Sequence, residues 1–157
     1  MATAPRERLI SVDSHVHFTD DWVKARLPER LRKVWDNAVA TQAKYDAEVH
    51  RQGQPSLRME DFVDLEAAMD PGHFEPNAKL AAMDRDGVEA EVIFPEVGGM
   101  NFCCPRLMGD DWREALAGYN DSMADFAAVD PKRLLVAYQI PVFDPDFAVK
   151  EILRAQK

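Results

Sequence analysis

From residue 77 onward the sequence alternates between helical and strand patterns, and this alternation limits the folds that the chain can adopt. Asn77 can cap a helix that runs through Asp86, and Gly87 supplies the left-handed position that ends it. An apolar strand is predicted directly afterwards, over residues 90–94. A helix that leads straight into a buried strand is half of an α/β repeat, which favours a parallel sheet with helical crossovers.

The same pattern occurs again downstream. A helix is predicted to end near Asp130, and an apolar strand over 134–140 follows it. A further helix begins at Asp144, an N-cap residue followed by a proline that suits the first helical turn. Residues 77–157 are therefore expected to hold further β/α units, the last of them truncated within its helix at Lys157. The helix before Asp130 presents one apolar face to the core: Trp112, Leu116, Tyr119, Met123 and Phe126.

The first strand is predicted over residues 9–18, and it carries His15 and His17 one residue apart. Side chains alternate faces along a strand, so Asp13 shares a face with both histidines. Two neighbouring imidazoles can bind one divalent metal ion, and a pair of structural histidines is the alternative. Asp13 either orients a ligand histidine or is a simple polar strand residue. The opposite face of the strand is assigned to three residues: Val12, Ser14 and Val16.

Between this strand and residue 77, a long helical pattern begins at Pro28 and ends at Gly53. Loops are predicted over 52–60 and 70–76, with a short helical piece over 62–69. The long helix carries many charges and separates two strands that should be neighbours. Residues from about 22 to 76 are therefore interpreted as a helical insertion that lies outside the core.

Composition limits the partners of the chain. Its 157 residues are 46% apolar and 30% charged, which is typical of one globular domain. The formal charge of −9 argues against nucleic acid, because phosphate backbones bind to clusters of Lys and Arg. The start of the chain lacks the apolar stretch of a secretory signal, and no run is long enough to span a bilayer. A cytoplasmic protein that binds a small molecule is expected.

Cys103 and Cys104 are adjacent, a spacing that suits neither a stable disulfide nor a zinc motif. Two reduced cysteines in a loop or pocket wall are predicted. A nucleophilic role is the weaker alternative, because no histidine is placed locally to activate either thiol.

Several stretches, in order, resemble the barrels of the amidohydrolase superfamily. Residues 12–17 are similar to the His-x-His motif that opens those barrels. Residues 80–88 resemble the second helix and strand of the family, and the third unit is similar to residues 119–121, 130–134 and 140–141. Together these stretches resemble the amidohydrolase-related group, which includes aminocarboxymuconate-semialdehyde decarboxylase alongside true hydrolases.

The resemblance implies that residues 1–157 form the N-terminal part, about three β/α units, of a TIM-like (β/α)₈ metal-dependent barrel. His15 and His17 would be ligands of a divalent metal ion, with zinc the first candidate. The other ligands and the general base would lie beyond Lys157, and neither His50 nor His73 is expected to touch the metal. Enzymes of this group hydrolyse or decarboxylate carboxylated or cyclic small molecules. Both reactions use the His-x-His pair, so His15 and His17 do not indicate which of the two is catalysed.

A substrate carboxylate could be bound by Arg58, with Arg51 as the lesser candidate, although a solvated loop arginine is the commoner role. Phe18, Trp22 and Phe94 are candidates for an aromatic substrate pocket.

Two non-enzymatic alternatives remain open for the truncated chain, which is expected to be inactive alone. In the first, it is a fragment or half-barrel that pairs with a copy of itself or with a complementing chain, because an unclosed sheet leaves its edges bare. In the second, it is a metal-binding module that uses His15, His17 and a carboxylate from within the chain.

Overall fold

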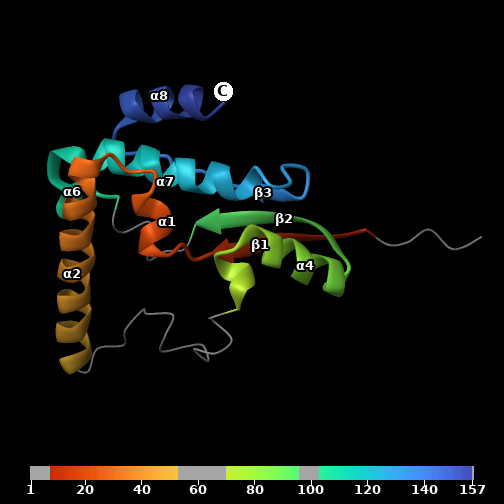
Figure 1. Ribbon diagram of the computed structural model, residues 1–157. Coiled ribbons are helices and arrows are strands. Elements are labelled where there is room, and N and C mark those ends of the chain that lie inside the picture. The colour runs from red at the N-terminus through yellow and green to blue at the C-terminus, as the bar shows by residue number, and fades with distance from the viewer. Residues whose placement is uncertain (1–7, 53–69, 96–102, 157) are drawn as a thin grey trace, which may run out of the picture.

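Three parallel strands form the only sheet in the described part of the chain (Figure 1). A computed structural model describes residues 8–52, 70–95 and 103–156. The strands are β1 (Leu9–Val16), β2 (Val88–Pro95) and β3 (Leu134–Val136), hydrogen-bonded in that order. The α/β class and the parallel sheet that the alternating pattern predicts are confirmed.

The helix that leads into β2 is α4 (Pro76–Asp86), and its N-cap is Glu75 instead of the predicted Asn77. The Glu75 carboxylate accepts hydrogen bonds from the backbone nitrogens of Asn77, at 3.2 Å, and Ala78, at 2.6 Å. Two of the N–H groups left free at a helix start are thereby satisfied. Gly87 ends the helix in the left-handed conformation, with φ of 73°, as predicted.

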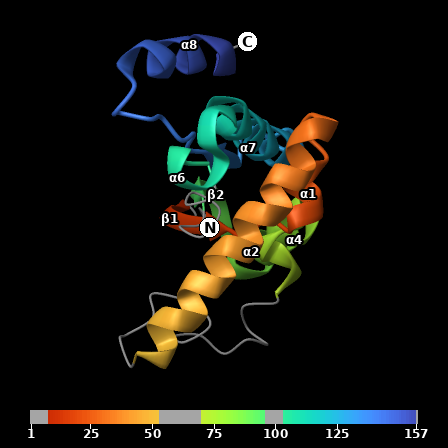
Figure 2. The same ribbon diagram turned by 90° about the vertical axis from the view of Figure 1, so that its left-hand side faces the viewer.

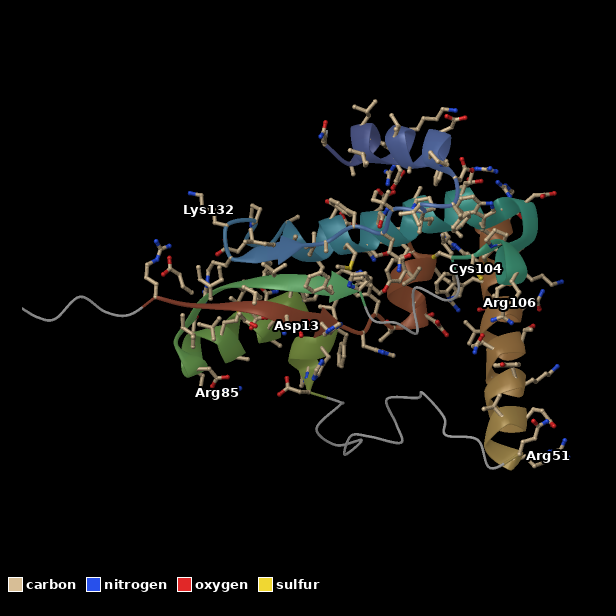
Figure 3. The ribbon with its side chains drawn as sticks, turned by 180° about the vertical axis from the view of Figure 1, so that it is seen from behind. Asp13, Arg51, Arg85, Cys104, Arg106 and Lys132 are labelled. Atoms are coloured by element: carbon tan, nitrogen blue, oxygen red, sulfur yellow. The ribbon has the colours of Figure 1, made fainter. Side chains whose placement is uncertain are left out.

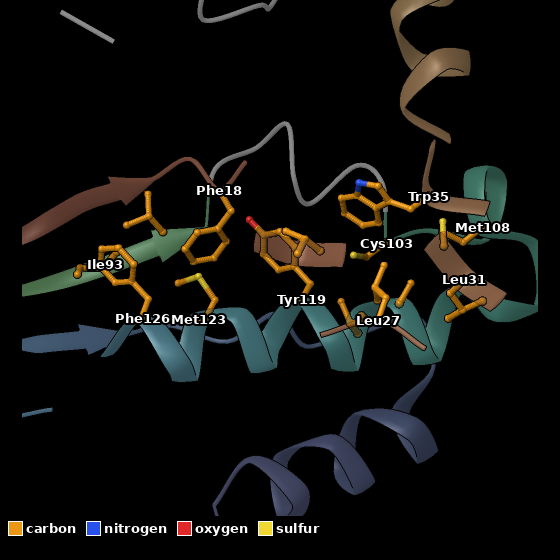
Figure 4. Packing of buried hydrophobic residues seen from close by; sticks show 14 of the residues in the cluster. Phe18, Leu27, Leu31, Trp35, Ile93, Cys103, Met108, Tyr119, Met123 and Phe126 are labelled. Carbon is orange, nitrogen blue, oxygen red and sulfur yellow. The ribbon is translucent and has the colours of Figure 1, made fainter. Parts of the chain in front are cut away.

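Helix α7 (Trp112–Ala127) carries the largest share of the core. Its apolar face packs against Phe18 and Ile93 at one end of the cluster and against Leu27 and Leu31 at the other (Figure 4). All five residues that helical spacing assigns to this face are at most 5% exposed, so that prediction is confirmed.

Helix α2 (Glu29–Arg51) follows the short α1 (Asp20–Lys24), and its first half is part of the core. Leu31 is fully buried and Trp35 is 1% exposed. The far end of the helix projects away from the other elements (Figure 2), where Tyr45 is 56% exposed. The predicted helix is confirmed, whereas its placement outside the core is wrong for the first half, since the apolar stripe there packs on the cluster that α7 forms.

Strand β3 ends at Val136, short of the predicted end at Ile140. Beyond it, the side chain of Asn120 on α7 binds the backbone of Gln139 in both directions. The Gln139 nitrogen donates to Asn120 Oδ1 at 2.9 Å, and Asn120 Nδ2 donates to the Gln139 carbonyl at 3.1 Å. The strand ends early because a side chain on α7 replaces a neighbouring strand as the hydrogen-bonding partner.

Helix α8 (Pro145–Ala155) begins at its predicted cap, where Asp144 Oδ1 accepts a hydrogen bond of 3.1 Å from the Phe147 nitrogen. The helix packs on α7 through its buried residues Ala148 and Glu151. None of the helices in the described ranges is both long and apolar enough to cross a membrane. The outer side of α8 exposes three apolar side chains: Val149, Ile152 and Leu153.

Candidate functional site

Strand β1 turns His15 away from the helix that covers the other face of the strand. On the covered face, Ser14 Oγ accepts a hydrogen bond of 2.7 Å from Lys79 Nζ of α4, and Val16 is fully buried. His15 stands opposite Phe94 in the register with β2, with ring centroids 6.2 Å apart. The side chain of His15 is 43% exposed and is accessible from the open face of the sheet.

A β-bulge in β1, just before Ser14, interrupts the alternation of side chains between the two faces of the strand. Between Ser11 and Ser14, β1 has one residue more than β2. Val12 is consequently 69% exposed, which corrects its predicted place on the covered face. Asp13 lies beside His15, with its Oδ1 3.5 Å from the Nε2 atom of the histidine.

Asp13 and His15 form part of the wall of a pocket of about 620 Å³ at the carboxyl ends of the strands. Figure 3 shows Asp13 on β1 and Cys104 at the start of α6 (Pro105–Met108). Pockets with mainly apolar walls and a few polar groups are typical of small-molecule sites, and barrel enzymes place their sites at this end of the sheet. Aromatic and polar side chains complete the wall: Phe94, Tyr138, Gln139 and Phe143.

His17 lies just past the end of β1, and its backbone nitrogen donates a 2.8 Å hydrogen bond to the carbonyl of His73 in the 3₁₀ turn η2 (Pro71–His73). This contact between distant residues could not be predicted from the sequence. Within the described residues, no group of three or more His, Cys, Asp or Glu side chains is placed to hold a metal ion. His15 and Asp13 offer two donors where a catalytic zinc takes three protein ligands. The role of His15 and His17 as metal ligands stays a prediction.

Cys103 and Cys104 are both reduced and both line the pocket, as predicted. Burial raises the pKa of the Cys103 thiol far above its usual range, and the neighbouring Cys104 raises it further. Cys103 is therefore a protonated thiol at neutral pH, which makes it a poor nucleophile.

Phe18 and Trp22 pack in the core, and neither belongs to the pocket wall. The Phe18 ring lies 5.9 Å from Trp22 and 5.8 Å from Tyr119, measured between centroids. Trp22 Nε1 also donates a 3.4 Å hydrogen bond to the carbonyl of Ser122 on α7. Phe18 and Trp22 therefore both have a structural role in the core. The prediction that they contact a substrate stays a prediction.

Of the two arginines considered for a substrate carboxylate, only Arg51 lies within the described residues, and it does not belong to the pocket wall. Arg58 lies outside the described residues. Arg51 is the last residue of α2 and forms an ion pair with Glu48 on the same helix.

Gln139 is a pocket residue that sequence reasoning missed. It was assigned to a buried strand over 134–140, and the structure places it in the pocket wall instead. One feature of the sequence could have identified it. Gln139 is a polar residue near the carboxyl end of an apolar run, and alternation puts it on the same face as Leu135 and Ala137.

No protein-family model and no curated protein sequence matches this chain. Among solved structures, the chain is similar to an amidohydrolase from Mycobacterium avium subsp. paratuberculosis K-10, with a TM-score of 0.59 and 18% sequence identity. The similarity covers 98% of this chain and 47% of that one, so this chain spans about half the length of the solved structure. The described sheet and helices therefore share the fold of one part of an amidohydrolase.

Proposed function

We propose that this chain is the N-terminal part of a metal-dependent (β/α)₈ enzyme of the amidohydrolase type, with His15 and His17 as two of its metal ligands. The observation that carries the proposal is the position of His15, beside Asp13 in a pocket at the carboxyl end of a parallel sheet. Residues from the ends of several strands make up the active sites of such barrels. The fold similarity to an amidohydrolase supports the same conclusion.

The remaining ligands and the general base are assigned to further strands outside these 157 residues. The donor count among the described residues supports this assignment, since they supply fewer than three donors at one point. Zinc is the metal that we assign, because imidazole and carboxylate donors suit it. The reaction class is hydrolysis or non-oxidative decarboxylation of a carboxylated or cyclic small molecule in the cytoplasm, in the manner of the aminocarboxymuconate-semialdehyde decarboxylase group.

The open side of the sheet is assigned to contact with more β/α units, supplied by the same polypeptide, by a second copy or by another chain. Large apolar side chains are exposed on the strands, including Ile10 at 47%, Val12 at 69% and Leu135 at 43%. Bare apolar strands of this kind are normally covered in parallel sheets. Without that cover, the chain is expected to be catalytically inactive.

A self-contained metal-binding module is the second candidate. It is favoured by one observation, namely that Asp13 already lies within 3.5 Å of His15 inside this chain. Such a module would bind zinc tightly and stoichiometrically without any further strand.

Calorimetric titration with zinc tests both candidates, with the variants His15→Ala/His17→Ala and His73→Ala. The proposal predicts weak zinc binding by the wild-type chain that the double variant loses. His73→Ala is the matched control, because only the backbone carbonyl of His73 contacts His17 in the described hydrogen bonds. Tight one-to-one binding that the double variant loses would favour the module instead. Binding that is identical in wild type and double variant would overturn both.

A further inference from the structure

The segment after β3 turns a regular series of side chains toward the open face of the sheet. The ladder continues one residue beyond the strand, since the Ala137 nitrogen donates a 2.9 Å hydrogen bond to the Ile93 carbonyl. Leu134 is 1% exposed on the covered face, whereas Leu135 is 43% exposed on the open one. Alternation then places Ala137 and Gln139 on the side of Leu135. Ala137 and Gln139 both line the pocket.

The backbone of Gln139 is held in place without help from its own side chain. Asn120, which is fully buried, binds both the nitrogen and the carbonyl of Gln139. Asn120 Nδ2 also donates to Glu151 Oε1 at 2.8 Å. Arg154 binds the same carboxylate from the other side, with two contacts of 2.8 Å. This network fixes the pocket wall at Gln139, as the supporting groups of a binding site do.

The side-chain amide nitrogen of Gln139 is buried, and the described residues hold no hydrogen-bond acceptor for it. Buried amide donors are nearly always paired, because an unpaired one loses its hydration without compensation. Gln139 stands in a pocket wall where apolar and aromatic groups predominate. A donor placed in such a wall is the kind of group that orients a small molecule.

We propose that the Gln139 side-chain amide donates a hydrogen bond to a carbonyl oxygen of a ligand that occupies this pocket. The inference rests on the ligand pocket of the proposed function, and it is independent of the metal ligands. It assigns a specificity-determining role to a residue outside the His-x-His strand.

The charges of the pocket wall favour one type of ligand oxygen as the acceptor for Gln139, an uncharged carbonyl over a carboxylate. No Lys or Arg belongs to the wall as far as the structure describes it, and Asp13 contributes a carboxylate. In the metal-free chain, a ligand carboxylate would therefore face a like charge with no Lys or Arg in the described wall to offset it. An uncharged carbonyl, as in an amide, ester or lactone, fits the wall better. The aromatic rings of Phe94, Tyr138 and Phe143 suit a flat or cyclic body.

The test uses three probes of similar size: acetophenone, which carries a neutral carbonyl, ethylbenzene, which lacks it, and benzoate. Binding is followed by NMR through the side-chain amide signals, and the Gln139 pair is assigned in the wild-type chain by triple-resonance spectra. Acetophenone is expected to shift the Gln139 amide signals and to bind the wild-type chain about tenfold more tightly than ethylbenzene, as one hydrogen bond provides. Benzoate is expected to bind more weakly than acetophenone.

In Gln139→Leu, the preference for acetophenone over ethylbenzene is expected to disappear, whereas Gln156→Leu, on the exposed end of α8, should retain it. An unchanged preference in Gln139→Leu, or a wild-type Gln139 amide signal that acetophenone does not shift, would overturn the inference. The wild-type shift needs no variant, so it remains decisive if Gln139→Leu fails to fold. Zinc titration of Gln139→Leu should match wild type, which separates failure of this inference from failure of the metal proposal.

Discussion

The carboxylate of Asp13 lies beside the imidazole of His15, with 3.5 Å between Oδ1 and Nε2. The two residues share a face of β1 through the alternation of its side chains, and both side chains remain accessible, at 84% and 43% exposure. A carboxylate beside a histidine can orient the ring or share a cation with it. The pair is therefore the best-formed donor group on the open face of the sheet.

Asp13→Asn should weaken zinc binding by about 10- to 100-fold, the usual effect of removing a carboxylate that supports a metal ligand. Calorimetric titration measures the change. Asp21→Asn is the control, because the Asp21 side chain is 96% exposed on α1. Equal zinc affinity in Asp13→Asn and wild type would show that the carboxylate plays no part in the site.

Trp35→Ala should lower the free energy of unfolding by about 3 to 5 kcal/mol, as the loss of a large buried aromatic side chain does. Trp35 is 1% exposed, and its Nε1 donates a 3.0 Å hydrogen bond to Asp20. Tyr45→Ala, on the projecting end of the same helix, should change stability by no more than about 0.5 kcal/mol. Urea denaturation of both variants measures the difference. Similar losses in the two would mean that α2 packs evenly along its length.

Lys79→Met should destabilise the chain by about 3 kcal/mol, because it leaves the Glu91 carboxylate buried without its partner. The two side chains are only 13% and 11% exposed, and Lys79 Nζ lies 3.0 Å from Glu91 Oε2. The double variant Lys79→Met/Glu91→Leu should recover most of the loss, since no unpaired charge remains. Arg85→Met, at an exposed pair, is the control. A double variant as unstable as the single one would contradict this account.

Acid should destabilise the contact between α7 and α8 through Glu151. Burial alone would raise the pKa of Glu151, but the hydrogen bonds from Arg154 and Asn120, with the charge of Arg154, outweigh it and hold the pKa below its ordinary value. The carboxylate therefore contributes stability above the unfolded pKa of about 4.3, and this contribution is lost as the pH falls through the folded pKa. Unfolding of wild type and Glu151→Gln at a series of pH values measures it.

Glu151→Gln should be less stable than wild type at pH 7 and should lose less stability on acidification. Asp146→Asn, at an exposed site on α8, should follow the wild-type curve. Parallel curves for wild type and Glu151→Gln would show that Glu151 does not carry the acid sensitivity.

The parts of the fold that follow from local chemistry could be predicted from the sequence. Gly87 ends α4 because the left-handed position there favours glycine, and Asp144 caps α8 with its carboxylate. The apolar face of α7 also follows from spacing alone, since residues three and four apart share a side of a helix. For the same reason the position of His15, on the face away from Ser14, could be predicted from alternation.

The features that were missed depend on contacts between distant residues. The stripe on α2 shows that one face is apolar, but only the packing against α1, α6 and the core cluster decides which half is buried. The end of β3 is set by Asn120, which lies in a different element from Gln139. The bulge at Asp13 arises from the register with β2, which a single strand does not reveal.

Diffraction from crystals of the chain soaked in zinc, recorded on both sides of the zinc absorption edge, tests the central claim most directly. The account predicts an anomalous peak at the carboxyl end of β1, about 2.0 to 2.1 Å from an imidazole nitrogen of His15 and another of His17. A zinc peak elsewhere in the molecule, with none at these two histidines, would contradict it.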